Sequence, residues 1–199
     1  MKNNLKSEIA GCVVILIILF SSSLNAQILS EFGIKGGANF AILSNLDGSE
    51  TKTGILAGVY TKIKIPVTPV SVQTEVLYAQ YGAKQTGGDQ DIILNYIQVP
   101  VLLKFGFNVP AAPVKPNVFF GPYLSFKTKA EFENSVAVNP DSFNNNVRDQ
   151  DYGVVVGAGL DIGKLRFNLR YSAGLINIFE EGANGEKNGG IAITFGVAL

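Results

Sequence analysis

The feature that most constrains this chain is an alternation of apolar and polar residues that changes face at every second position. The clearest example is the stretch 165–172, where Leu, Phe, Leu and Tyr alternate with Arg, Asn, Arg and Ser. Because successive side chains of a β-strand point to opposite sides, this period predicts a strand with one apolar and one polar face. The pattern recurs along the chain with no helical period between the repeats.

The alternation predicts eight strands separated by polar or proline-rich connections. Their expected ranges are 31–41, 53–65, 70–83, 91–107, 117–129, 150–162, 165–178 and 189–199. The connections after the first, third, fifth and seventh strands are expected to be long, and the other three short. This order is typical of an outer-membrane barrel, which has short periplasmic turns and longer outer loops. Pro100, inside the fourth range, predicts a bulge or a locally weakened ladder because proline has no N–H to donate.

The period does not by itself decide which face is inside, because a lipocalin-like soluble barrel has the same alternation turned inside out. Three features favour lipid outside. The apolar face is bulky, and the polar face is rich in small residues that suit a narrow interior. Only 16% of the residues are charged, against about 25% in soluble proteins. The fold expected is therefore all-β, an eight-stranded antiparallel up-and-down transmembrane β-barrel in the outer membrane.

The N-terminal segment has the organisation of a secretory signal peptide. Lys2 and Lys6 precede an apolar run from Ile9 to Phe20, and small polar residues lead to Ala26. Cleavage is expected between Ala26 and Gln27, leaving a barrel domain over residues 27–199. The alternatives are an uncleaved anchor, although the run is shorter than the roughly 20 residues of a membrane helix, and lipoprotein processing at Cys12.

The composition excludes several classes of function. The chain has no His and one Cys, at position 12 in the expected signal peptide, so a His-assisted hydrolase and a thiol nucleophile are excluded. Lys plus Arg equals Asp plus Glu at 16 each, which gives no reason to expect nucleic acid. The segment Asp149–Asp151 lacks the Gly and the closing Glu of a calcium loop and is expected to be a solvated loop. We therefore expect no enzyme, no cofactor and no metal site.

The polar face carries residues expected to form a network in the barrel lumen. They are Lys35, Lys62, Lys64, Glu75, Gln98, Lys104, Asp161, Arg166 and Arg170. A barrel of this size is filled by its own side chains, and isolated charges inside it are costly, so these groups should pair with one another or with water. The network is interpreted as a structural plug, with a proton or ion path as the alternative.

The chain resembles the PorT-like outer-membrane β-barrel proteins of Bacteroidetes over about residues 32–199. The resemblance rests most on the segment Tyr96–Lys104, in which Gln98 stands where relatives often carry Glu. Supporting segments are Phe32–Asn39, Glu75–Tyr78, Gly121–Tyr123 and Asp151–Gly159. The resemblance implies an outer-membrane barrel. The namesake of the family participates in type IX protein secretion.

The function expected is a structural or interaction role in the outer membrane, without catalysis. Lipid should contact the barrel wall, and a protein partner should bind the extracellular loops, the longest of which is predicted over 130–149. The first alternative is an accessory component of type IX secretion. The second is a small-solute binding protein or narrow pore, suggested by a lumen that Gly153, Gly157 and Gly159 would widen.

Overall fold

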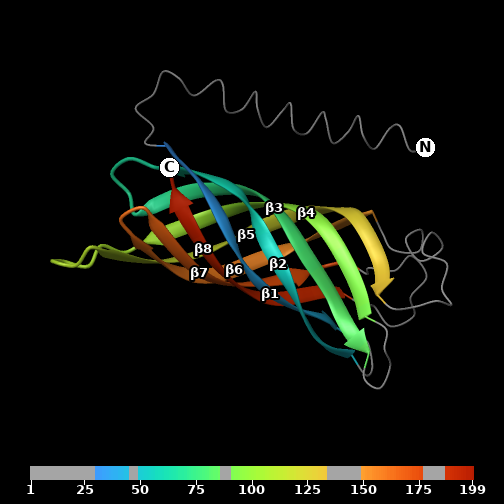
Figure 1. Ribbon diagram of the computed structural model, residues 1–199. Helices are drawn as coiled ribbons and strands as arrows, with labels where there is room; N and C mark the ends of the chain where they lie inside the picture. Colours follow the sequence, from blue (N-terminus) through green and yellow to red (C-terminus); the bar gives the residue numbers. More distant parts are fainter. Residues whose placement is uncertain (1–29, 45–48, 86–90, 134–148, 177–186) are drawn as a thin grey trace.

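Eight antiparallel strands close into one barrel in the computed structural model, which describes residues 30–44, 49–85, 91–133, 149–176 and 187–199 (Figure 1). The strands are β1 (Ser30–Ser44), β2 (Ser49–Lys64), β3 (Val70–Gln85), β4 (Asp91–Gly106), β5 (Val114–Glu133), β6 (Gln150–Ile162), β7 (Leu165–Gly174) and β8 (Lys187–Ala198). Each pairs with the next along the chain, and β8 pairs with β1. The predicted eight-stranded antiparallel barrel is confirmed.

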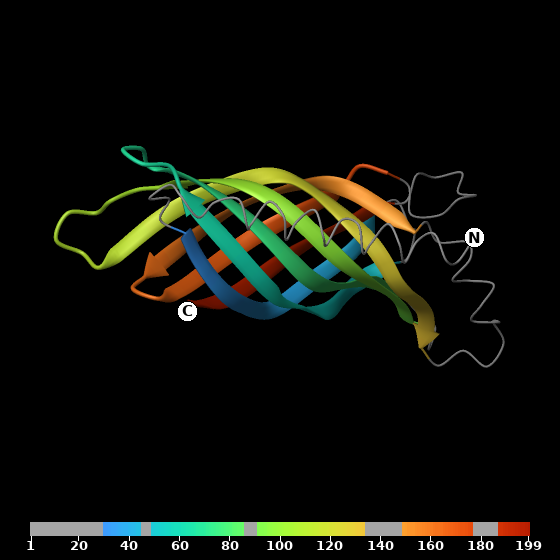
Figure 2. The ribbon, with the colours of Figure 1, turned by 90° about the horizontal axis from the view of Figure 1, so that it is seen from above.

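The strands run obliquely to the barrel axis, as Figure 2 shows. The last strand completes the wall against the first, with Ile34 opposite Val197 and Phe40 opposite Ile191. Beyond β8, the Leu199 backbone N–H donates to the Phe32 carbonyl oxygen at 2.9 Å. The sheet therefore has no free edge at this seam, which satisfies the backbone groups that an open sheet would expose to lipid.

The alternation seen in the sequence separates the inside of the barrel from the outside. On β7, Leu169 is 54% exposed while the adjacent Arg170 is 1% exposed. Phe167, Tyr171 and Phe195 are likewise exposed on the outer wall. Among the strand residues whose side chains the structure describes, no charged side chain occupies the outward face. An apolar outer wall around a polar interior is the arrangement of a membrane barrel and the reverse of a lipocalin-like one.

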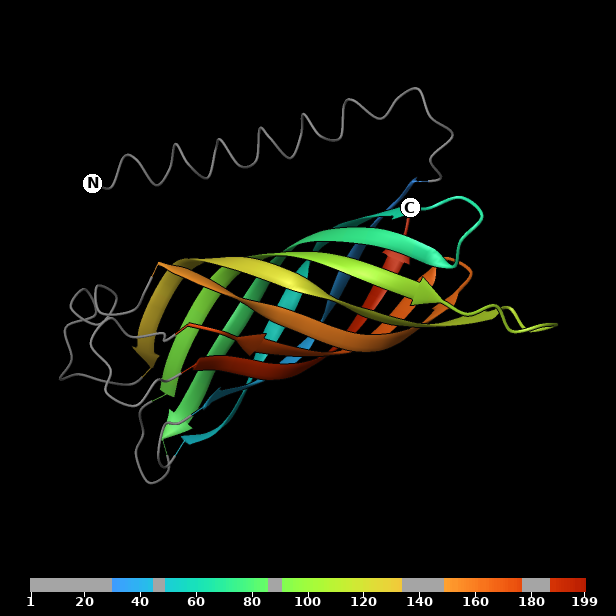
Figure 3. The ribbon, with the colours of Figure 1, turned by 180° about the vertical axis from the view of Figure 1, so that it is seen from behind.

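The barrel has two distinct ends. At the turn end, residues 65–69, 107–113 and 163–164 connect strands, and the chain ends there at Leu199. Figure 3 shows the β4–β5 connection projecting beyond this end. The opposite end, the loop end, has the strand ends joined by residues 45–48, 86–90, 134–148 and 177–186, whose structure lies outside the described residues.

The predicted alternation of long and short connections is only partly correct. Two connections predicted to be long are short: four residues lie between β1 and β2, and five between β3 and β4. The β2–β3 connection, predicted to be short, also has five residues. β5 extends from Val114 to Glu133, beyond both predicted limits, whereas β7 ends at Gly174 rather than near residue 178. Polar strand ends lack the apolar alternation by which the ranges were predicted, although their backbones continue the ladder.

The ladder shifts register away from Pro100. A shift occurs at Asn95–Tyr96 between β4 and β5, and another between Thr51 and Leu56 along β2. Pro100 faces Tyr123 of β5 with the register unchanged on either side of it. The bulge predicted at Pro100 is therefore absent there, but the β3–β4 pairing is interrupted between Thr74–Val101 and Leu77–Gln98, which agrees with the weakened ladder. Pro100 is buried on the inward face.

Three inward glycines lie directly opposite an aromatic residue of the neighbouring strand. The pairs are Gly33 with Tyr60, Gly153 with Tyr123 and Gly157 with Phe119. A Cβ atom at any of these glycines would come within 2.7 Å of ring atoms of its partner. Each ring therefore lies across the backbone of a glycine, a cross-strand arrangement that fills the lumen and covers the glycine's backbone.

The N-terminal predictions lie outside the described residues. The expected signal peptide and the cleavage position between Ala26 and Gln27 both precede residue 30, the first residue described. Within the described ranges, no helix is long and apolar enough to cross a bilayer.

Candidate functional site

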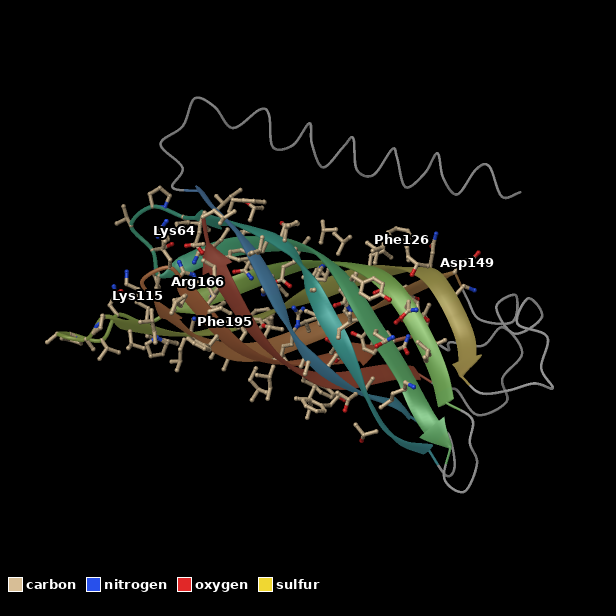
Figure 4. All side chains as sticks on the ribbon, in the orientation of Figure 1. Lys64, Lys115, Phe126, Asp149, Arg166 and Phe195 are labelled. Atoms are coloured by element: carbon tan, nitrogen blue, oxygen red, sulfur yellow. The ribbon has the colours of Figure 1, made fainter. Side chains whose placement is uncertain are left out.

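The inward polar residues line the lumen together with buried apolar side chains such as Leu77 and Leu102. Six of the predicted side chains, Lys35, Lys62, Glu75, Lys104, Arg166 and Arg170, are buried there and form ion pairs. Gln98 is also buried, and Asp161 is partly buried. Lys64 differs, because it is exposed at the turn end, where Figure 4 shows it near Lys115 and Arg166. Its strand reaches the barrel mouth at that residue, so solvent replaces the lumen around it.

The centre of the lumen holds an ion triad of Lys35, Glu75 and Arg170. The Lys35 Nζ lies 2.6 Å from Glu75 Oε1, and the Arg170 Nη1 lies 2.6 Å from Glu75 Oε2. The Gln73 Nε2 also donates to Glu75 Oε1 at 2.6 Å. One carboxylate thus joins cations from β1 and β7 across the barrel interior, and the triad carries a net charge of one positive unit.

Small neighbours make room for these long side chains. Lys35 lies between Gly58 of β2 and Gly196 of β8 in the ladder. Arg170 lies between Gly157 of β6 and Ala192 of β8. Because the adjacent inward positions carry little or no side chain, the lysine and arginine can extend over them toward Glu75. The glycines and the charged residues of the lumen therefore belong to one packing arrangement.

A second group, the turn-end cluster, consists of Glu31, Lys62, Lys104, Asp161 and Arg166. Arg166 binds Glu31 with two nitrogens, at 2.9 Å from Nε and 2.6 Å from Nη2. Lys62 joins Glu31 at 2.9 Å to Asp161 at 3.3 Å. Lys104 reaches the other oxygen of Asp161 at 3.1 Å. Bidentate arginine–carboxylate geometry and shared partners make this a connected network rather than a set of separate pairs.

The half of the lumen nearer the loop end, here called the loop half, differs from the turn-end cluster because its polar groups are mostly neutral. Asp151 accepts hydrogen bonds at Oδ2 from the Tyr123 hydroxyl at 3.3 Å and from Asn188 Nδ2 at 3.0 Å. Gln98 donates to the Tyr81 hydroxyl at 3.1 Å. Tyr81 in turn packs edge-on against Tyr96, with ring centroids 6.1 Å apart. Amides, hydroxyls and tyrosine rings thus replace the ion pairs of the other half.

Charged members of the lumen that sequence reasoning missed include Glu31 and Asp151. Glu31 was left out of the expected network, and Asp151 was expected in a solvated loop, which is wrong because it is buried in β6. The alternation of odd- and even-numbered positions along a strand could have identified both residues. Glu31 is on the same face of β1 as Lys35, and Asp151 is on the same face of β6 as Asp161. Their contacts could not have been found in this way, because Glu31 and Arg166 are 135 positions apart.

The expectation that glycines widen the lumen is also wrong. The rings of Tyr123 and Phe119 occupy the space beside Gly153 and Gly157, and amide oxygens of Asn168 and Asn117 occupy the space beside Gly159. No group of three or more His, Cys, Asp or Glu side chains suited to a metal occurs within the described ranges. The lumen is filled by polar and apolar side chains together, an interior suited to holding charges in fixed positions.

The chain has similarity to solved structures and to one protein family. Structures of similar fold include Ail of Yersinia pestis (14% identity, TM-score 0.45, 85% of this chain and 99% of Ail). OprG of Pseudomonas aeruginosa has 11% identity and a TM-score of 0.45, and the match covers 85% of this chain and 94% of OprG. Outer membrane protein W of E. coli has 13% identity and a TM-score of 0.38, and the match covers 87% of this chain and 100% of that protein. No curated protein matches the chain. The family model described as "Outer membrane protein beta-barrel domain" matches residues 20–180, so the chain belongs to this family and is an outer-membrane protein.

Proposed function

We propose that this protein is a non-conducting, non-catalytic outer-membrane barrel that acts by binding a partner at its ends. The observation that supports this most directly is the central triad, which places Lys35, Glu75 and Arg170 in contact across the lumen. Glu75 and Arg170 are each about 1% exposed, so water does not reach them through an open pore. The extracellular loops remain the expected contact surface, because loops on a rigid scaffold commonly carry function.

The proposal predicts the absence of ion conductance. The purified protein, reconstituted in a planar lipid bilayer, is expected to give no discrete current steps, since the ion triad closes the lumen. The variant K35A/E75A/R170A removes all three side chains together and leaves no unpaired charge, so it should give measurable steps. Regular steps from the unaltered protein would contradict the proposal and favour the alternative of a small-solute pore.

We further propose a PorT-like role, as an accessory component of type IX protein secretion. The support is the resemblance over Tyr96–Lys104, the segment that forms most of β4. In this segment Gln98 and Lys104 point inward and are buried, while Val101 and Leu103 face lipid. The residues of the resemblance therefore lie on both faces of one strand.

A basic cavity at the turn end supports a role on the periplasmic side, which the short turns of such barrels face. The cavity has a volume of about 210 Å³, and its lining includes Lys62, Lys64, Lys104 and Lys115 with Asp161 as the only acidic residue. Lys64 and Lys115 are exposed at its rim, where Figure 4 shows both. A mouth with excess positive charge is suited to a partner that presents acidic groups.

Complementation of a deletion strain tests this role. The unaltered gene should restore the amount of type IX cargo in the culture medium, whereas K64E/K115E should restore less than half of it. K164E is the matched control, because Lys164 is exposed in the β6–β7 turn but does not line the cavity. Heat-modifiable migration would show that each variant forms a barrel. Full secretion in the deletion strain itself would exclude the secretion role while leaving the non-conducting barrel unaffected.

A further inference from the structure

Asp151 is a buried carboxylate whose hydrogen-bond donors are all neutral. It is 4% exposed, and its Oδ2 accepts from Tyr123 and Asn188. Within the described ranges, Asp151 forms no ion pair and its Oδ1 has no hydrogen-bond donor. The other buried carboxylate of the lumen, Glu75, has both oxygens bound to cations. A buried anion without a counter-charge is costly, so its surroundings must supply one or it must be neutral.

The unpartnered side-chain atoms around Asp151 are oxygens, two of them amide oxygens that only accept and one a hydroxyl that can accept or donate. Among the described residues, Gln98 Oε1, Ser125 Oγ and Asn188 Oδ1 are buried and have no hydrogen-bond partner. The three residues are 0%, 1% and 2% exposed. In each of the two amides the nitrogen is already used, by Tyr81 for Gln98 and by Asp151 for Asn188. The free groups are therefore oxygens.

The ladder places the residues that carry these oxygens on neighbouring strands of one side of the lumen. Gln98 of β4 is directly opposite Ser125 of β5, and Ser125 is directly opposite Asp151 of β6. Same-face neighbours in a ladder have Cβ atoms about 4.5–5.5 Å apart. Asn188 approaches from β8 and contacts the same carboxylate at 3.0 Å. Gly174 of β7 lies between Asp151 of β6 and Asn188 of β8. A Cβ atom at Gly174 would lie 3.3 Å from Asp151 Oδ1.

From this arrangement we propose that the loop half of the lumen binds a monovalent cation, Na⁺ or K⁺. Its ligands are Asp151 Oδ1, Ser125 Oγ and the amide oxygens of Gln98 and Asn188. One carboxylate and three neutral oxygens form a neutral complex with a singly charged ion, and neutral oxygen dipoles are the ligands by which proteins replace the water around K⁺. Calcium is bound by a larger oxygen set that commonly includes several carboxylates.

The site is close to the loop end of the barrel. Asp151 is the second residue of β6, and Asp149, two positions earlier, is exposed at the rim, where Figure 4 shows it beside Phe126. Asp149 pairs with Lys127 at 3.1 Å. Within the described part of the barrel, a cation that enters from the loop end does not have to cross the filled centre of the lumen to reach Asp151. The inference is independent of the proposed function.

The test uses the full-length protein purified in detergent, with the melting temperature followed by heat-modifiable gel migration. NaCl and KCl are titrated against choline chloride at constant ionic strength. Binding to the folded state should give a saturable rise of roughly 2–4 °C with Na⁺ or K⁺ and none with choline. The salt that acts at the lower concentration identifies the preferred ion. Equal melting temperatures in all three salts would overturn the proposal.

Two aspartates two positions apart, Asp149 just before β6 and Asp151 within it, supply the matched variants. D151N should lose the response to Na⁺ and K⁺, whereas D149N should keep it, since only Asp151 faces the oxygen cluster. A D151N protein with an unchanged response would overturn the site. S125A keeps the carboxylate and provides a second variant if D151N fails to fold; it should shift the half-saturating concentration upward at least about threefold. An unchanged half-saturating concentration in S125A would contradict its assignment as a ligand.

Discussion

Replacing Glu75 with glutamine is expected to destabilise the barrel by about 3–5 kcal/mol, because it leaves two buried cations without their shared anion. Lys35 and Arg170 each lie 2.6 Å from Glu75 in the folded state, and Arg170 is 1% exposed. The amide of E75Q keeps the shape of the side chain but cannot balance either charge. Unfolding by guanidinium in detergent, with the folded fraction read from unboiled gel migration, gives the change in the free energy of unfolding.

Two controls separate the triad from a general effect of charge. D149N removes an exposed carboxylate, so it should change stability by less than about 0.5 kcal/mol. K35M/E75L/R170M removes all three charges and should recover most of the stability lost in E75Q, since apolar groups of similar volume often replace buried ion pairs without loss. An E75Q barrel as stable as the unaltered protein would show that the two cations do not depend on Glu75.

Replacing Gly33 with valine is expected to cost about 3 kcal/mol, at the upper end of overpacking effects. A Cβ atom at Gly33 would lie 2.6 Å from Cε1 and Cζ of Tyr60 and would also meet the backbone oxygen of Val197. Tyr60 cannot easily move aside, because its hydroxyl donates to Glu31 at 3.0 Å inside the turn-end cluster. The same unfolding experiment measures the loss.

Gly36, on the same strand, supplies the matched control for this substitution. It faces outward, and a Cβ atom there would have its closest neighbours at 3.9 Å, an ordinary contact distance. G36V should therefore leave stability within about 0.5 kcal/mol of the unaltered protein. Equal losses in G33V and G36V would mean that valine acts through the strand backbone and not through the contact with Tyr60.

The period of the sequence was sufficient to predict the faces of the strands. Phe167 and Arg166 lie on opposite sides of the wall as predicted, because the side-chain period of a strand is a local property of the backbone. Strand limits were predicted less well. The residues 44–52 were expected to form a loop, although β1 continues to Ser44 and β2 begins at Ser49. Hydrogen bonding between backbones tolerates polar side chains there, so composition alone does not show where a strand ends.

The partners within the lumen could not be predicted from the period. The alternation of positions along each strand predicts that Lys62, Glu75 and Arg170 face the lumen. It does not predict that Arg170 contacts Glu75 while Lys62 contacts Asp161. Those contacts depend on the tilt of the strands and on which inward neighbours are small, such as Gly58 and Gly157. Both are properties of the closed barrel. The oxygen cluster at Asp151 was missed for the same reason, since it combines residues of four strands.

The ion pairs of the lumen also bear on how the barrel assembles. Glu31–Arg166, Lys62–Asp161 and Glu75–Arg170 each join the first three strands to β6 or β7 and span 135, 99 and 95 positions of the chain. A hairpin or an incomplete sheet cannot form them. A half-assembled sheet in the bilayer would therefore hold uncompensated charges against hydrocarbon, at a cost of several kcal/mol for each buried charge. These three pairs form only when the wall closes, which couples membrane insertion to closure and disfavours partly inserted intermediates.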